Sequence, residues 1–122
     1  MVGYATDGVA KHGQAFTWWL IWRVHQLPPD RGERYHIFNH LIDGQGVRCA
    51  QADGPTYSTD DWLTGDVAIQ AFQLEGPVEA GRGPFWMRVG MGTYPEIENQ
   101  AVLDAAGHAV SDAVILGPLP GD

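Results

Sequence analysis

The chain has 122 residues, of which 44% are hydrophobic, and this is the size and apolar content of one ordinary folded domain over residues 1–122. Its formal net charge is −8 with only seven Lys and Arg residues, which argues against nucleic acid as a partner, because binding phosphates requires a basic surface. The longest apolar run, residues 18–22, is too short to span a bilayer, and residues 1–13 lack the apolar segment of a signal peptide. We therefore expect no membrane insertion.

Short segments rich in aromatic and β-branched residues are separated by turn residues along the whole chain. Sixteen Gly and eight Pro supply these breaks, since Gly permits positive φ and Pro fixes φ. This rhythm is typical of an all-β fold, and we predict a two-sheet antiparallel sandwich, jelly-roll or immunoglobulin-like, of about eight strands. The expected strands are 3–6, 14–25, 33–42, 47–52, 67–74, 85–92, 101–104 and 113–116.

Two connections can be interpreted in more detail. The four residues 43–46, Asp-Gly-Gln-Gly, are expected to close a hairpin between their flanking strands, because Asp-Gly favours turns that match the twist of a strand pair. Residues 102–110 leave two alternatives open, a short strand or one turn of helix. Gly107 argues against a longer helix, since Gly is unfavourable in a helix interior.

Alternation along three of the expected strands defines a core face. Trp62 lies just before a turn and is expected to plug one end of the sandwich. The predicted core residues are Phe16, Trp18, Leu20, Trp22, Ile37, Leu41, Phe85, Met87 and Val89.

The middle of the chain carries a recognisable series of short motifs. They are YHIFNHLID at 35–43, GQG at 44–46, QADGP at 51–55, the Thr59 to Trp62 segment and GD at 65–66. This series resembles the C-terminal β-sandwich domain of Chloroflexi-type membrane glycosyltransferases and related envelope proteins. The strand at 85–91, the LGP sequence at 116–118 and the Trp22-Arg23 pair extend the resemblance over nearly the whole chain.

The resemblance implies a sandwich fold and a carbohydrate or cell-envelope context outside the cytoplasm. The chain departs from the pattern at three positions, Asn39, Gln70 and Gly92, where the family often has an apolar residue, Asp and Tyr. A family site that used those positions would therefore not carry over to this chain.

Two tryptophans leave their strands on the side opposite the predicted core. Because exposed aromatic rings stack on the apolar faces of sugars, Trp19 and Trp86 are candidate carbohydrate-binding residues. Arg23, His40 and Arg88 would supply polar contacts. This pattern favours a non-catalytic binding or accessory module. The alternative is a structural or assembly domain, in which the same rings lie in a protein–protein interface such as a homodimer.

Four acidic residues in predicted turns are candidate ligands for a structural calcium ion, because calcium takes six to eight oxygen ligands from carboxylates and loop carbonyls. The other interpretation is turn capping by Asp, and no further cofactor is predicted. The four residues are Asp43, Asp53, Asp60 and Asp61.

The sequence contains little that indicates a catalytic site. The chain contains no nucleophile elbow, P-loop or dinucleotide-binding motif. His36 and His40 are four residues apart on one strand, which separates them by about 13 Å, too far for one zinc ion without other ligands. Cys49 is the single cysteine and is predicted to be a buried, unreactive thiol. A metal-assisted hydrolase with an Asp/His loop site is the remaining enzyme hypothesis.

Overall fold

A computed structural model describes residues 3–7, 14–25, 27, 34–75, 84–94, 100–103 and 106–119 of the chain. The predicted all-β antiparallel sandwich is confirmed, and the described residues contain no α-helix. Residues 33 and 104, at the ends of two expected strands, lie outside the described residues. The elements are β1 (Gly3–Asp7), β2 (Ala15–Arg23), β3 (Arg34–Ile42), β4 (Arg48–Pro55), a 3₁₀ turn η1 (Thr59–Asp61), β5 (Val67–Glu75), β6 (Trp86–Tyr94), β7 (Val102–Leu103), β8 (Ala109–Ser111) and β9 (Val114–Leu116).

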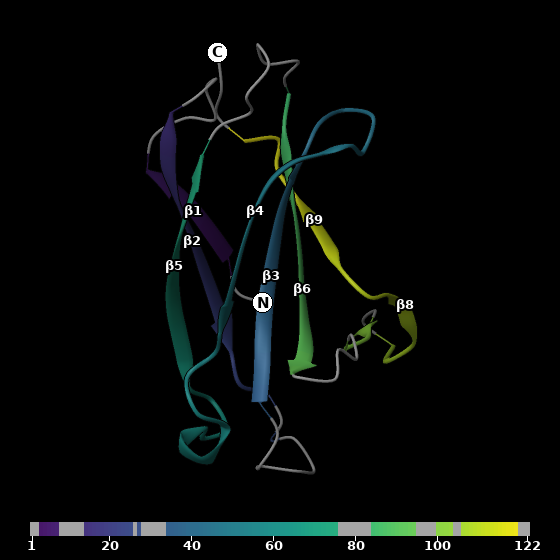
Figure 1. Cartoon of the computed structure of the whole chain (residues 1–122). Helices are drawn as coiled ribbons and strands as arrows, with labels where there is room; N and C mark the ends of the chain where they lie inside the picture. Colours follow the sequence, from purple (N-terminus) through teal and green to yellow (C-terminus); the bar gives the residue numbers. More distant parts are fainter. Residues whose placement is uncertain are drawn as a thin grey trace.

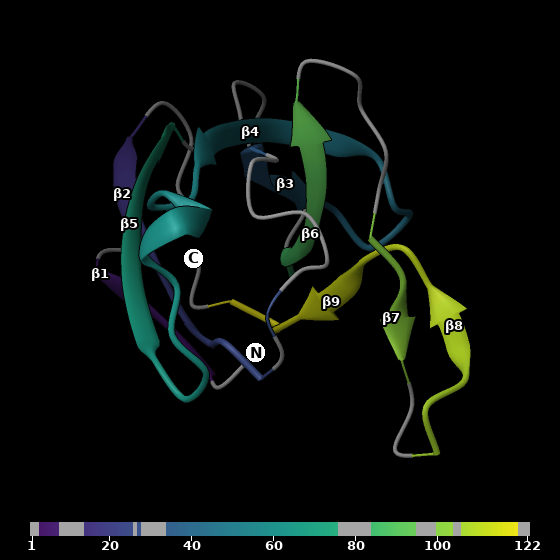
Figure 2. The same cartoon turned by 90° about the horizontal axis from the view of Figure 1, so that it is seen from below.

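Seven strands form the two layers of the sandwich (Figure 1). One sheet has the order β1-β2-β5 and the other has the order β4-β3-β6-β9. The constant-type immunoglobulin domain has its fourth strand in the sheet of the first, second and fifth strands, whereas β4 here pairs with β3 in the other sheet. Strands β7 and β8 form a separate antiparallel pair that projects from the sandwich beside β9 (Figure 2).

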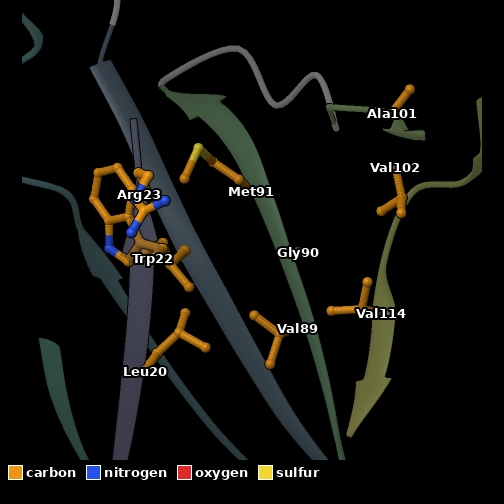
Figure 3. A pocket seen from close by; sticks show the side chains of 10 residues that line it. Leu20, Trp22, Arg23, Val89, Gly90, Met91, Ala101, Val102 and Val114 are labelled. Carbon is orange, nitrogen blue, oxygen red and sulfur yellow. The ribbon is translucent and has the colours of Figure 1, made fainter. Parts of the chain in front are cut away.

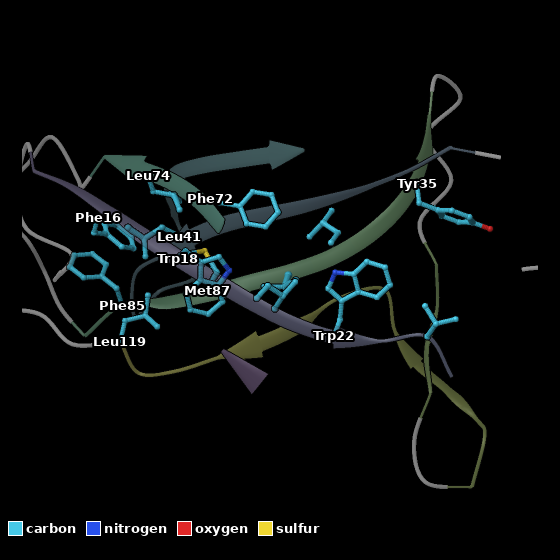
Figure 4. Packing of buried hydrophobic residues seen from close by; sticks show 14 of the residues in the cluster. Phe16, Trp18, Trp22, Tyr35, Leu41, Phe72, Leu74, Phe85, Met87 and Leu119 are labelled. Atoms are coloured by element: carbon cyan, nitrogen blue, oxygen red, sulfur yellow. The ribbon is translucent and has the colours of Figure 1, made fainter. Parts of the chain in front are cut away.

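The predicted core is confirmed, since all nine of its residues are buried between the sheets (Figure 4). Successive side chains of a strand point to opposite faces of the sheet, and this accounts for the burial of these residues. The even-numbered residues of β2 and the odd-numbered residues of β3 and β6 point inward. Trp62 plugs one end as predicted. Its ring packs edge-on against Trp22 at 5.2 Å and stacks on Tyr35 at 5.6 Å, measured between ring centroids.

Two buried indoles are paired with side-chain amides, as buried polar groups require. Trp18 Nε1 donates to Asn39 Oδ1 at 2.9 Å, and Asn39 Nδ2 donates to the carbonyl oxygen of Ala52 at 3.0 Å. Trp22 Nε1 donates to Gln70 Oε1 at 2.7 Å. The first of these networks joins the two sheets, because Trp18 is on β2 whereas Asn39 is on β3.

One side edge of the sandwich is closed by contacts between β4 and β5. Gln70 Nε2 donates to the carbonyl oxygen of Pro55 at 3.1 Å. Gly54 lies against the Phe72 ring, where an added Cβ would stand 3.2 Å from Cε1. The opposite edge is flanked by β1 and β9, which are both shorter than the strands that they pair with.

The hairpin at Asp43 is confirmed, but its turn differs from the expected one. Within residues 43–46, Gly46 is the one residue with a positive φ, of 81°. The Asp-Gly pair therefore does not form a turn with two left-handed central residues. The Asp43 carboxylate instead accepts the backbone N–H groups of Gln45 and Val47, at 2.8 and 2.9 Å. This geometry is a four-residue turn followed by a left-handed Gly.

The helical alternative for residues 102–110 is wrong for the described part of that segment. Val102 pairs with Ser111 and Leu103 pairs with Ala109 in an antiparallel register. Gly107 has a φ of 85°, which a continuing helix cannot adopt. In the part of the chain described above, no helix is long and apolar enough to cross a membrane.

Candidate functional site

The five binding residues predicted from the sequence are divided between the two outer surfaces of the sandwich. Trp19 and Arg23 lie on β2, in the three-stranded sheet. His40, Trp86 and Arg88 lie on β3 and β6, in the four-stranded sheet. Alternation alone showed that these side chains leave the core, but it could not show which sheet each strand would join. The five residues therefore belong to two separate candidate surfaces.

The first surface is the outer face of the four-stranded sheet, which we call the polar sheet face. Its central residues are direct cross-strand neighbours, because His40 pairs with both Gln51 and Arg88. Phe38 pairs with both Asp53 and Gly90. Directly paired residues point to the same side of a sheet. The polar sheet face consists of Phe38, His40, Gln51, Asp53, Trp86 and Arg88.

The Phe38 ring forms the apolar centre of the polar sheet face. It lies over Gly90, where an added Cβ would overlap the ring. The ring centroid is 5.2 Å from that of His40 and 5.7 Å from the guanidinium carbon of Arg88. A structural role in covering Gly90 is one function of such a ring, because aromatic side chains commonly cover glycines in strands. A half-buried ring with polar neighbours is also a suitable platform for a ligand.

Charges surround His40 on this face. Burial is the main effect and lowers the pKa of His40 below its usual value of 6.5. The carboxylate of Asp53 opposes this shift by raising the pKa, whereas Arg48 and Arg88 lower it further. The imidazole is therefore neutral at pH 7, so one ring nitrogen can donate a hydrogen bond while the other accepts one.

Arg88 and Trp86 are both held in place by neighbouring residues. Arg88 Nη2 forms an ion pair with Asp112 Oδ1 at 3.1 Å, and both side chains are substantially exposed. The Trp86 ring is half-buried between two glycines, since a Cβ added at Gly117 would lie 2.9 Å from Cδ1 and one at Gly44 would lie 3.7 Å from Cζ3. Trp86 therefore borders the polar sheet face at the β3–β4 hairpin instead of projecting from it.

The second surface is the outer face of the three-stranded sheet, which we call the apolar sheet face. Trp19 pairs with Ala5 on β1 and with Ala71 on β5, and Ile21 pairs with Ile69. These large apolar side chains are unusually exposed to solvent. The exposed fraction is 38% for Trp19 and 65% for Ile69. The apolar sheet face consists of Ala5, Trp19, Ile21, Val67, Ile69 and Ala71.

The four carboxylates proposed as calcium ligands have separate local environments. Asp43 accepts backbone N–H groups in its own hairpin turn, and Asp53 lies on β4 beside Gln51. Asp60 and Asp61 belong to η1, at the end of the sandwich away from that hairpin (Figure 1). Among the described residues, no group of three or more His, Cys, Asp or Glu side chains could hold a metal ion. The described residues therefore provide no cluster of ligands that would support a zinc site or a metal-dependent hydrolase.

Cys49 occupies an irregular position in β4. The register between β3 and β4 shifts there, since Leu41 pairs with Ala50 whereas Ile42 pairs with Arg48. Cys49 is thus the extra residue of a bulge, and its thiol is half-buried. Burial raises the pKa of the thiol, and the nearby Asp43 carboxylate adds to this effect. The protonated thiol is a poor nucleophile.

Sequence reasoning missed Phe38 and Gln51 as site residues. The alternation placed Phe38 opposite the core face, but its pairing with Gly90 depends on the register between β3 and β6. Gln51 reaches the polar sheet face only because β4 follows β3 in an antiparallel register. The signal that could have found Phe38 is the pair of glycines, Gly90 and Gly92, on the outward side of its partner strand.

No protein-family model matches the chain, and neither the curated proteins nor the solved structures include a match. The resemblance to the glycosyltransferase C-terminal domain therefore stays a prediction from the sequence.

Proposed function

We propose that the chain is a non-catalytic binding module and that the polar sheet face binds carbohydrate. The observation that carries this proposal is the direct cross-strand grouping of Phe38, His40 and Arg88 around one half-buried ring. Carbohydrate ligands combine apolar ring faces with hydroxyl groups that both donate and accept hydrogen bonds. An aromatic ring beside a neutral imidazole and a guanidinium offers the matching contacts.

The grouping also matches the cell-envelope context that the sequence resemblance implies. The residues of the polar sheet face lie on regular strands, so the ladder hydrogen bonds fix their spacing before any ligand binds. Such preorganisation lowers the entropic cost of association. Gln51 and Asp53 add an amide and a carboxylate beside the ring, and these groups suit hydroxyls better than they suit an apolar ligand.

The test starts with a glycan array and continues with calorimetric titration of the best-bound oligosaccharide. Arg88→Gln and His40→Ala should each weaken binding by about tenfold, because each removes a hydrogen-bonding partner. Trp19→Ala is the control, since it removes an aromatic ring from the other sheet and should leave the affinity unchanged. Absence of any bound glycan would overturn the proposal, and so would loss of affinity in Trp19→Ala with Arg88→Gln unchanged.

The apolar sheet face supports a second candidate function, self-assembly through a homodimer. Three exposed side chains, Trp19, Val67 and Ile69, lie on adjacent strands of one sheet. A contiguous apolar surface of this kind is typical of a protein–protein contact. The six residues of the apolar sheet face are uncharged, and the described charged side chains on the same side of the sheet, Arg23 and Asp7, lie at its two ends.

Sedimentation equilibrium tests this second candidate. A dimer would have twice the 13.3 kDa mass of one chain. Ile69→Glu should convert it to a monomer, because apposed like charges destabilise an interface. A strict monomer over the full concentration range would exclude the assembly function and leave the carbohydrate proposal untouched.

A further inference from the structure

A cavity of about 340 Å³ lies between the two sheets and opens to solvent, and Arg23 at the end of β2 is among its lining residues (Figure 3). Leu20 and Trp22 border it from β2, and Val89 and Met91 border it from β6. Val114 of β9 and the start of β7 border it on the far side, and the side chains of these strands face the same space (Figure 3).

The length of edge strand β9 explains why the sheets leave space here. This strand pairs only with residues 87–89 of β6. Gly90 adds no side chain of its own to the gap. The core is therefore less completely filled where β6 continues past the end of its pairing with β9.

The lining of the cavity is mostly apolar and carries one charged side chain among the described residues. Eight of the ten described lining residues are apolar, and the other two are Gly90 and Arg23. Arg23 is exposed at the end of β2, so its guanidinium can stay in water while its stem borders the cavity. Within the described part of the chain, Arg23 has no ion pair or side-chain hydrogen bond, whereas Arg88 is paired with Asp112.

The volume limits the ligand to a small molecule. An apolar cavity of about 150 Å³ accommodates one benzene ring, so a cavity of 340 Å³ has room for roughly two rings or for a chain of about ten carbons. This volume also lies at the lower end of the range of ordinary ligand sites. A whole oligosaccharide does not suit an apolar space of this size.

We propose that this cavity binds an amphipathic carboxylate, with its apolar body between the sheets and its carboxylate at Arg23. The guanidinium is the single charged group among the described lining residues, and its planar fork matches a carboxylate. The inference is independent of the carbohydrate proposal, because the cavity and the polar sheet face share no residue.

The experiment uses sodium decanoate, titrated at pH 7.5 below its micelle concentration. Decanol and decyltrimethylammonium serve as matched ligands that keep the chain and change the head group. Methyl NMR spectra of the methionines locate the ligand, because Met91 lines the cavity whereas Met87, on the same strand, is fully buried elsewhere in the core. We expect decanoate to shift the Met91 methyl resonance most strongly and to bind at least about tenfold more tightly than either matched ligand.

Variants separate the charge from the cavity. Arg23→Gln should weaken decanoate binding by about tenfold or more while leaving decanol binding unchanged, and its exposed position spares the fold. Val102→Trp should abolish binding by filling the cavity from its half-buried position on β7. Arg88→Gln and Ile69→Gln, on the two outer faces, should bind decanoate normally.

Three results would overturn the proposal. They are equal affinity for decanoate and decyltrimethylammonium, an unchanged affinity in Arg23→Gln, and loss of binding in Ile69→Gln with Val102→Trp unaffected. The last result would place the ligand on the apolar sheet face.

Discussion

Replacing Asn39 by Leu tests the buried polar network that joins the two sheets. Asn39 and Trp18 are both 0% exposed, and the indole N–H of Trp18 donates to the Asn39 amide. Leu has a similar volume, so the substitution removes the acceptor without creating a large cavity. The Trp18 N–H is then left without a partner in a position that water does not reach.

The size of the effect follows from the two hydrogen bonds that are lost. An unpaired buried donor or acceptor costs about 1–3 kcal/mol, and Asn39 serves both Trp18 and the Ala52 carbonyl. We therefore expect Asn39→Leu to lower the free energy of unfolding by about 2–4 kcal/mol, a large part of the 5–15 kcal/mol typical of a domain. Gln70→Leu is the comparison and should cost only about 1 kcal/mol, because its bond with Trp22 is only partly buried.

Urea unfolding followed by tryptophan fluorescence measures these changes, and a double-mutant cycle assigns them. Trp18→Phe removes the donor, so in the double variant Trp18→Phe/Asn39→Leu neither polar group is left unpaired. The double variant should be more stable than the sum of the single changes predicts, by about 1–3 kcal/mol. A coupling energy within about 0.5 kcal/mol of zero would refute the role given to this hydrogen bond.

Three further predictions concern single residues. Gly90→Ala should destabilise the domain by about 1–3 kcal/mol, because the new Cβ overlaps the Phe38 ring, and Phe38→Ala in the same chain should recover part of that loss in urea unfolding. The free energy of unfolding should decrease as the pH falls below 6.5, since the folded state lowers the pKa of His40 and the unfolded state gains its proton first; His40→Gln should lessen this decrease. Cys49 should react more slowly with iodoacetamide at pH 8 than the same chain does in guanidinium chloride, because burial raises the thiol pKa.

Each of these predictions has an opposing outcome. Full stability in Gly90→Ala would mean that the Phe38 ring moves aside without cost. An identical pH profile in His40→Gln would remove His40 as the origin of the acid sensitivity. Equal alkylation rates for folded and unfolded chain would show that the position of Cys49 in its bulge does not protect the thiol.

Local patterns were sufficient to predict the sandwich strands and the inward faces of β2, β3 and β6, but they did not predict β8. Alternating large residues, as in the segment from Phe16 to Trp22, impose a period of two that only a strand satisfies, and burial of one face then follows. The same logic placed Asn39 on the core side, although nothing local identified Trp18 as its partner. That pairing depends on how two sheets are superposed, which is a tertiary property.

The five predicted binding residues lie on two different sheets, which alternation within single strands could not show. Trp19 and Arg88 share the same outward character in their strands, but β2 and β6 belong to different sheets, so their side chains point away from each other. The register between strands also could not be predicted from the sequence. The position of Phe38 over Gly90 depends on how β3 aligns with β6. Local sequence preferences also did not distinguish a strand from a helical turn in residues 102–110. The antiparallel pairing of Val102 with Ser111 shows that the described part of this segment forms strands.

The asymmetry between the two edges of the sandwich explains why an interior cavity and two exterior faces can have separate functions. At the β4–β5 edge, Gln70 bonds to Pro55 and Phe72 fills the space beside Gly54, so the sheets are held together there. At the other edge the short strand β9 pairs only with residues 87–89 of β6. A ligand that enters beside Arg23 would not contact the polar sheet face, because the cavity lining includes none of its residues. Carboxylate binding, carbohydrate binding and dimerisation should therefore respond to different substitutions, and a variant that impaired all three would indicate a loss of folding.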